Sequence, residues 1–167
     1  MDLDIDIDGW PQDADWPDLA ERACEAVEGV APELANPRLS VSLLFTLDEE
    51  VQTLNREWRT KDKPTNVLSF PMMTREELLA LRPDGGPEML GDIALARGTC
   101  VAGAAEKGIT LEQHAAHLII HGLLHLAGHD HVDSDEQAEA MEALEIKALA
   151  QMGIADPYGD RDQQESG

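Results

Sequence analysis

The chain has 167 residues and a mass of 18.2 kDa, the size of one domain. Hydrophobic residues make up 43% of it, which suffices for one packed core and excludes wholesale disorder. The 12 Lys and Arg residues stand against 34 Asp and Glu, and the resulting net charge of -22 excludes a generally basic nucleic-acid coat. Cys24 and Cys100 form no CxxC pair, which excludes a disulfide scaffold and a cysteine zinc ribbon.

The start of the chain, MDLDIDIDGW, carries acids where a secretory signal needs a basic and then an apolar segment. No apolar run approaches the roughly 18 residues of a membrane helix. We therefore expect a cytoplasmic protein that makes no contact with membranes.

The first part of the chain alternates strand and helix patterns. Apolar residues alternate with aspartates over residues 2–8, which predicts a strand with one buried and one acidic face. Pro17 opens a helical pattern over about 17–29. The β-branched and apolar segment 38–47 predicts a second strand, and Asp48 can cap a second helix.

The middle of the chain is less regular. Residues 66–70 predict a third strand, closed by proline, and residues 91–96 a fourth. The segment between them, 72–90, is rich in Gly and Pro and predicts a loop with a helical turn. A helix is expected from Leu95 to Gly108.

The last part of the chain is helical. Thr110 and Gln113 resemble a capping box that begins a long buried helix, which ends at Gly128. A final helix is expected from Asp133 or Ser134 to about Met152. These elements indicate one α+β domain, residues 1–153, with a mixed sheet of about four strands covered by helices; residues 154–167 form a polar, disordered tail.

All six histidines lie between residues 114 and 131. His121 and His125 are four residues apart, which puts both imidazoles on one helix face, at a spacing that one zinc ion can bridge. Gly128 lets the chain turn off the helix axis, so that His131 can approach as a third ligand. Three nitrogen ligands leave a fourth position for water, which is typical of catalytic rather than structural zinc. We expect this metal site at the end of the long buried helix.

Other readings of the histidine cluster stay open. His129 is a rival third ligand, although Gly128 interrupts the helix that would align it. His114 and His117 fit packing roles or contacts to the ligands. Asp130 can either orient a ligand imidazole or lie in a solvated loop.

The ligand spacing HxxxHxxGxxH is also that of the metzincin peptidases, whose motif is HExxHxxGxxH. Gly122 stands where that motif has its catalytic Glu. Loss of a general base costs roughly 10² to 10⁴ in rate, so the sequence disfavours proteolysis.

Three segments together resemble the YbeY family, the bacterial endoribonucleases and ribosomal RNA maturation factors. HGLLHLAGHDH at 121–131 is similar to the family signature HGxLHLxGxDH. LNREWRTKDKPTNVLSFP at 54–71 is similar to the family's segment LNxxxRxxDKPTDVLSFP, and LGDI at 90–93 matches a third short motif. Asn66 departs from the Asp that is usual in the second segment.

The resemblance implies a zinc ion held by His121, His125 and His131, and a catalytic role for Arg59. It also implies an α+β fold with a four-stranded sheet. The implied activity is a single-strand-specific endoribonuclease in 16S rRNA 3′-end maturation and ribosome quality control. The implied partners are ribosomal RNA, the small ribosomal subunit and assembly proteins, and DNA is not expected.

The basic residues give separate support for an RNA contact. Four of the 12 lie within eight positions: Arg56, Arg59, Lys61 and Lys63. The planar guanidinium of Arg59 can bind a phosphate through two hydrogen bonds. The alternative is a solvated face balanced by Glu57 and Asp62.

We hypothesise that zinc and Arg59 share the work of phosphodiester cleavage. The sequence leaves open whether water or the RNA 2′-hydroxyl is the nucleophile. It also leaves three alternative functions: an assembly factor with a structural zinc and little nuclease activity, a metallopeptidase, and a store for nickel or zinc.

Overall fold

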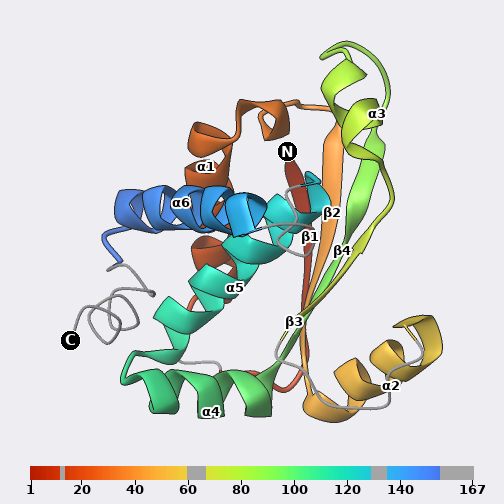
Figure 1. Ribbon diagram of the computed structural model, residues 1–167. Helices are drawn as coiled ribbons and strands as arrows, with labels where there is room; N and C mark the ends of the chain where they lie inside the picture. Colours follow the sequence, from red (N-terminus) through yellow and green to blue (C-terminus); the bar gives the residue numbers. More distant parts are fainter. Residues whose placement is uncertain (12–13, 60–66, 129–134, 155–167) are drawn as a thin grey trace.

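The structure is a computed structural model that describes residues 1–11, 14–59, 67–128 and 135–154, with the side chains of residues 58, 59, 135, 137 and 138 outside the description. One four-stranded sheet organises the described chain (Figure 1). The elements in chain order are β1 (Asp2–Ile7), α1 (Trp16–Val30), the 3-10 turn η1 (Pro32–Leu34), β2 (Leu39–Thr46), α2 (Asp48–Arg59), β3 (Val67–Pro71), α3 (Arg75–Ala80), β4 (Glu88–Ala96), α4 (Arg97–Lys107), α5 (Leu111–Leu126) and α6 (Asp135–Gln151).

The strand order is β1-β2-β4-β3. β1 and β2 pair in parallel, as do β2 and β4, whereas β3 runs antiparallel to β4 and forms one edge. This mixed sheet, with helices packed on it, confirms the α+β fold predicted from the sequence. Among the described residues, no helix combines the length and apolar character that crossing a membrane requires.

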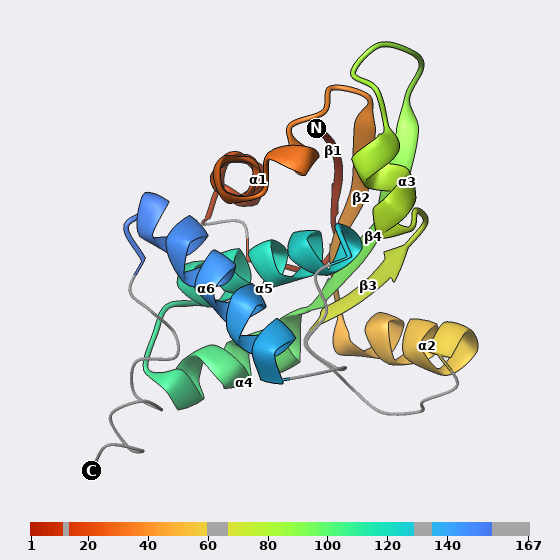
Figure 2. The ribbon, with the colours of Figure 1, turned by 45° about the horizontal axis from the view of Figure 1, so that its top comes forward.

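The two faces of the sheet differ. α1, α5 and α6 lie on one side of the sheet and α2 lies on the other (Figures 1 and 2). The core side chains of β2 are fully buried and point toward α1 and α5: Leu39, Val41, Leu43 and Phe45. Alternate residues of a strand point to opposite faces, so Ser40 and Ser42 lie on the side of α2.

The first strand is less buried than its alternating pattern predicts. Its apolar residues point to the helical face, but Leu3 and Ile5 are half-buried and Ile7 is 42% exposed. β1 is an edge strand, so the helices cover it incompletely.

The segment 72–90 contains the predicted helical turn but differs from the prediction at its end, where β4 begins. It holds a short helix, α3, whose first turn is fixed by a capping box between Thr74 and Glu77. β4 begins at Glu88, three residues before the predicted start, because the backbone N–H of Glu88 donates to the carbonyl of Arg38. Glu88 and Met89 are exposed, so their burial pattern does not mark them as part of a strand.

α5 is the central helix and packs directly on β3 and β4. Thr110 begins it with the predicted capping box, in which the Thr110 hydroxyl accepts from the N–H of Gln113. Two glycines let the helix approach the sheet closely. A Cβ atom at Gly122 would lie 3.0 Å from Ile93, and one at Gly91 would lie 2.6 Å from Leu126.

Candidate functional site

α5 carries four of the six histidines: His114, His117, His121 and His125. His114 and His117 are buried, while His121 and His125 are half-buried near the end of the helix. The sequence therefore places the two predicted ligands where they reach both the protein interior and the surface.

Glu145, on α6, joins two of these histidines. Its Oε1 atom lies 2.9 Å from Nδ1 of His121 and 3.0 Å from Nε2 of His117. The carboxylate is 1% exposed. Burial alone would raise its pKa, but the hydrogen bonds from His117 and His121, together with their charges, lower the pKa to about 2. Glu145 is therefore a buried carboxylate that accepts from two imidazoles.

Ser69, on β3, contacts His125. Its hydroxyl lies within hydrogen-bond reach of Nδ1 of His125. The register of β3 explains this contact, because Ser69 pairs with Ile93, which faces α5. Each of the two predicted ligands thus has its Nδ1 atom against a side chain from another element.

These contacts test whether the pair suits a metal. Nδ1 and Nε2 lie on opposite edges of the imidazole ring, so a partner at Nδ1 directs Nε2 away from it. Zinc ligands of this kind donate from the other ring nitrogen to a carboxylate, a backbone carbonyl or water. A serine hydroxyl can accept in the same way. Imidazole nitrogens suit zinc and related divalent ions. The chemistry of His121 and His125 therefore fits a metal-binding pair.

The remaining predicted site residues are not described. His131 and its rival His129 lie outside the described residues, as do Asp130, Lys61, Lys63 and Asn66. Arg59 is the last residue of α2, and its side chain is outside the description. Within the described part of the chain, no three His, Cys, Asp or Glu side chains form a group that could hold a metal. The complete ligand set thus remains a prediction.

His114 lies deeper in the protein. It is 2% exposed, and neither ring nitrogen has a hydrogen-bond partner among the described residues. Gly103 of α4 makes room for the ring, because a Cβ atom there would lie 2.7 Å from Nε2 of His114. Burial, with smaller effects of Lys107 and His117, lowers the pKa of His114 to about 4. His114 is a neutral core residue.

Sequence reasoning missed Glu145 and Ser69. Glu145 follows the buried Met141 by four residues and precedes the buried Leu149 by four, so helical spacing alone places it on the inner face of α6. A carboxylate at such a position was the available signal, since Glu is almost never fully buried without a partner.

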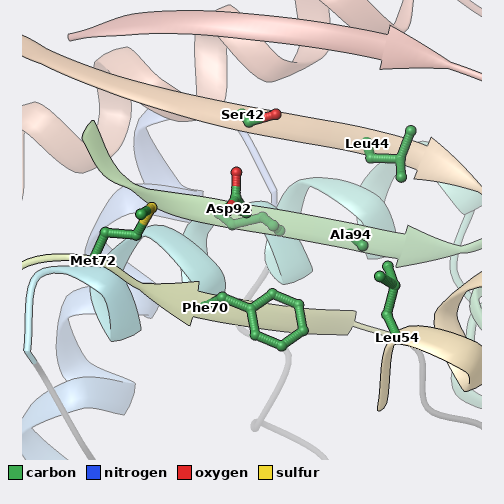
Figure 3. Close-up of a pocket in the computed structure, with 8 residues that line it drawn as sticks. Ser42, Leu44, Leu54, Phe70, Met72, Asp92 and Ala94 are labelled. Carbon is green, nitrogen blue, oxygen red and sulfur yellow. The ribbon is translucent and has the colours of Figure 1, made fainter. Parts of the chain in front are cut away.

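A separate groove of about 440 Å³ lies on the other face of the sheet (Figure 3). Ser42, Phe70 and Asp92 contribute from the strands, and Leu54 contributes from α2. Phe70 follows Ser69 on β3, so the groove and His125 lie on opposite sides of the same edge strand.

The comparisons with known proteins agree with the fold and the motifs. Residues 7–153 match the family model described as endoribonuclease YbeY. A protein named endoribonuclease YbeY from Erythrobacter litoralis is 66% identical over 161 residues, covering 96% of this chain and 99% of the relative. One of the same name from Novosphingobium aromaticivorans is 58% identical over 162 residues, covering 96% and 97%.

A solved structure is also similar. The solution structure of TM1509 from Thermotoga maritima matches with a TM-score of 0.59 and 25% identity, covering 97% of this chain and 93% of that one. These matches confirm the family resemblance found in the sequence motifs and the expectation of a nuclease. The chain belongs to the YbeY family of endoribonucleases.

Proposed function

We propose that this chain is a zinc-dependent, single-strand-specific endoribonuclease that acts in 16S rRNA 3′-end maturation and ribosome quality control in the cytoplasm. Zinc would be held by His121, His125 and His131, and Arg59 would contact the scissile phosphate. One observation carries the proposal: two imidazoles at the end of α5 each have Nδ1 against a side chain of another element, as zinc-binding histidines do.

The residues of the chain would divide the work as follows. His121 and His125 would hold the metal, and each has its Nδ1 atom in contact with a side chain of another element. Zinc, when bound, supplies a Lewis acid that can polarise a phosphoryl oxygen or lower the pKa of water. The guanidinium of Arg59 offers two parallel donors to the phosphate and stabilises the negative charge that develops during cleavage.

The structure gives a reason to prefer RNA cleavage over proteolysis. Gly122 occupies the position of the metzincin glutamate, and a Cβ atom there would lie 3.0 Å from Ile93 of β4. A carboxylate at this position would be directed at the sheet. Phosphodiester cleavage depends less on such a base, because metal and arginine electrostatics supply much of the stabilisation.

The charge of the chain bears on how it finds RNA. A net charge of -22 repels phosphates, so we expect weak, strongly salt-dependent binding to naked RNA. Specificity would then come from the small ribosomal subunit and its assembly proteins. Residues 1–153 would form the catalytic domain, and residues 154–167 a tail.

Cleavage of ribosomal RNA with an unprocessed 3′ end tests the proposal. Wild type, His125→Ala and Arg59→Ala are purified in parallel, and bound metal is quantified in each. We expect wild type to hold about one zinc and to cut, while both variants fail. Equal cutting by all three would reveal a contaminating nuclease, and cutting by none would favour the assembly-factor function.

The same substrate decides the nucleophile. A 2′-deoxy residue at the cleavage position removes the internal hydroxyl and leaves the phosphodiester intact. Products that end in 2′,3′-cyclic phosphate, together with resistance of the deoxy substrate, would show attack by the 2′-hydroxyl. Cleavage of both substrates would show attack by water.

A further inference from the structure

We infer that Glu145 is a positioning residue of the metal site, which fixes the tautomer of His121 and so presents Nε2 of that ring as the metal ligand. The inference rests on the proposed function, because it assigns a role toward the zinc proposed there. Glu145 lies on α6, outside the three motif segments 54–71, 90–93 and 121–131.

The hydrogen bond between Glu145 and His121 has one possible direction. An ionised carboxylate carries no proton and can only accept. Nδ1 of His121 lies 2.9 Å from Oε1 of Glu145, so Nδ1 must carry the proton. In a neutral imidazole the other nitrogen then holds the lone pair, and a metal binds there.

The carboxylate of Glu145 is itself held in place. Nε2 of His117 lies 3.0 Å from the same Oε1 atom, so Glu145 is fixed between two rings that are one helical turn apart on α5. On α6 three of the four neighbours of Glu145 at helical spacing are core residues: Met141, Ala148 and Leu149 are each no more than 1% exposed. Glu145 therefore has little freedom to move relative to His121.

The partner of His125 differs from the partner of His121. Ser69 contacts Nδ1 of His125 through a hydroxyl, which can donate as well as accept. Only the partner of His121 is both charged and restricted to accepting. A carboxylate also makes the imidazole that it accepts from more basic, which strengthens metal binding.

Burying the carboxylate of Glu145 costs free energy. Taking a carboxylate out of water is unfavourable, and replacing buried ionic groups by apolar residues of similar volume is often neutral or stabilising. Compared with an apolar residue of similar volume, a charged residue at 1% exposure in α6 thus offers little gain in stability. Orientation of a ligand supplies a reason for the charge.

The test uses the full-length protein and three variants. Glu145→Gln removes the charge and keeps an acceptor oxygen, whereas Glu145→Ala removes both. Glu139→Gln is the matched control. Glu139 lies on the same helix and is exposed, and its substitution removes the same charge.

Two quantities are measured. Nitrogen-15 NMR of the imidazoles in metal-free wild type and Glu145→Ala reports the tautomer of His121. Competition with a chelator gives the dissociation constant for zinc in all four proteins. We expect the Nδ1–H tautomer in wild type and a mixture in Glu145→Ala. Zinc binding should weaken by about 10- to 100-fold in Glu145→Ala, and by less in Glu145→Gln, which keeps an acceptor oxygen. Glu139→Gln should bind zinc as wild type does.

The outcomes separate this inference from the proposed function. An Nε2–H tautomer of His121 in wild type overturns the inference, and this result needs neither a variant nor a metal. Wild-type zinc affinity in Glu145→Ala overturns it as well and leaves the proposed function standing. A wild-type protein that binds no zinc overturns the proposed function and the inference together.

Discussion

The hydroxyl of Ser69 contacts Nδ1 of His125 and thereby joins the edge strand β3 to the last turn of α5. The two residues are 56 positions apart in the chain. Ser69 belongs to the segment 54–71 and His125 to the segment 121–131, so the fold brings two of the three family motifs into direct contact.

Replacing Ser69 by alanine tests the value of this contact. Ser69→Ala removes the partner of Nδ1 on His125 and leaves the ring in place. We expect zinc binding to weaken by about tenfold, the lower end of the usual effect for a residue that supports a ligand. Chelator competition measures this. Ser40→Ala on β2 is a control on the other face of the sheet, and equal affinities for all three proteins would contradict the account.

The rate of RNA cleavage should depend on the shape of the Arg59 side chain as well as on its charge. Arg59→Lys keeps the positive charge but loses the planar pair of donors, so the rate of RNA cleavage should fall nearly as far as in Arg59→Ala, by about 10² to 10³. Single-turnover cleavage measures this, with Arg22→Ala, an exposed arginine of α1 outside the basic cluster, as the control. A lysine variant as fast as wild type would show that Arg59 acts only as a point charge.

Because α5 packs closely on β4, a side chain at position 91 should lower the stability of the fold. A Cβ atom there would lie 2.4 Å from the backbone carbonyl of Phe70 and 2.6 Å from Leu126. Backbone cannot yield as a side chain can, so Gly91→Ala should destabilise the fold by about 1 to 3 kcal/mol. Chemical denaturation measures the change. Gly86→Ala, with nothing within 4 Å, is the control and should leave stability unchanged.

His114 predicts a pH dependence of stability. Its pKa is lowered from 6.5 to about 4 in the folded protein, chiefly by burial. Between these values the unfolded chain binds a proton that the folded chain does not, so stability is full above pH 6.5 and falls as the pH drops toward 4. His114→Leu should flatten the stability curve in this window. Identical slopes for wild type and variant in urea denaturation at each pH would contradict this prediction.

Glu145 adds a second, more acidic window. Its folded-state pKa of about 2 lies below the ordinary value of 4.5. The stability that this lowered pKa contributes is present above pH 4.5 and is lost as the pH falls toward 2. Wild type should therefore lose more stability than Glu145→Gln over this range. A variant with the same acid sensitivity as wild type would contradict the prediction.

Local signals carried the sequence predictions that the structure confirms. The capping box of Thr110 and Gln113 and the apolar run that follows it are read from neighbouring residues, and both appear in α5. Pro17 lies in the first turn of α1, close to the predicted start, and the Asp15 side chain caps that turn by accepting from the N–H of Asp18. Such features depend on residues a few positions apart.

The parts that the sequence did not reveal depend on distant contacts. Glu145 is 24 residues from His121, and no local pattern links them. The early start of β4 at Glu88 depends on the carbonyl of Arg38, which lies on another segment. Tertiary pairing decided these features. It also overturned one local prediction, because Leu95, expected to begin a helix, pairs with Phe45 inside β4, and α4 begins at Arg97.

The most direct test of the account is a zinc titration of metal-free protein during RNA cleavage. The metal is removed with a chelator, and zinc is added back in steps while cleavage of ribosomal RNA with an unprocessed 3′ end is followed. The account predicts no cleavage without metal, full recovery at about one zinc per chain, and no recovery in His121→Ala, His125→Ala or His131→Ala. Full activity of the metal-free protein, or normal recovery in any of these three variants, would contradict it.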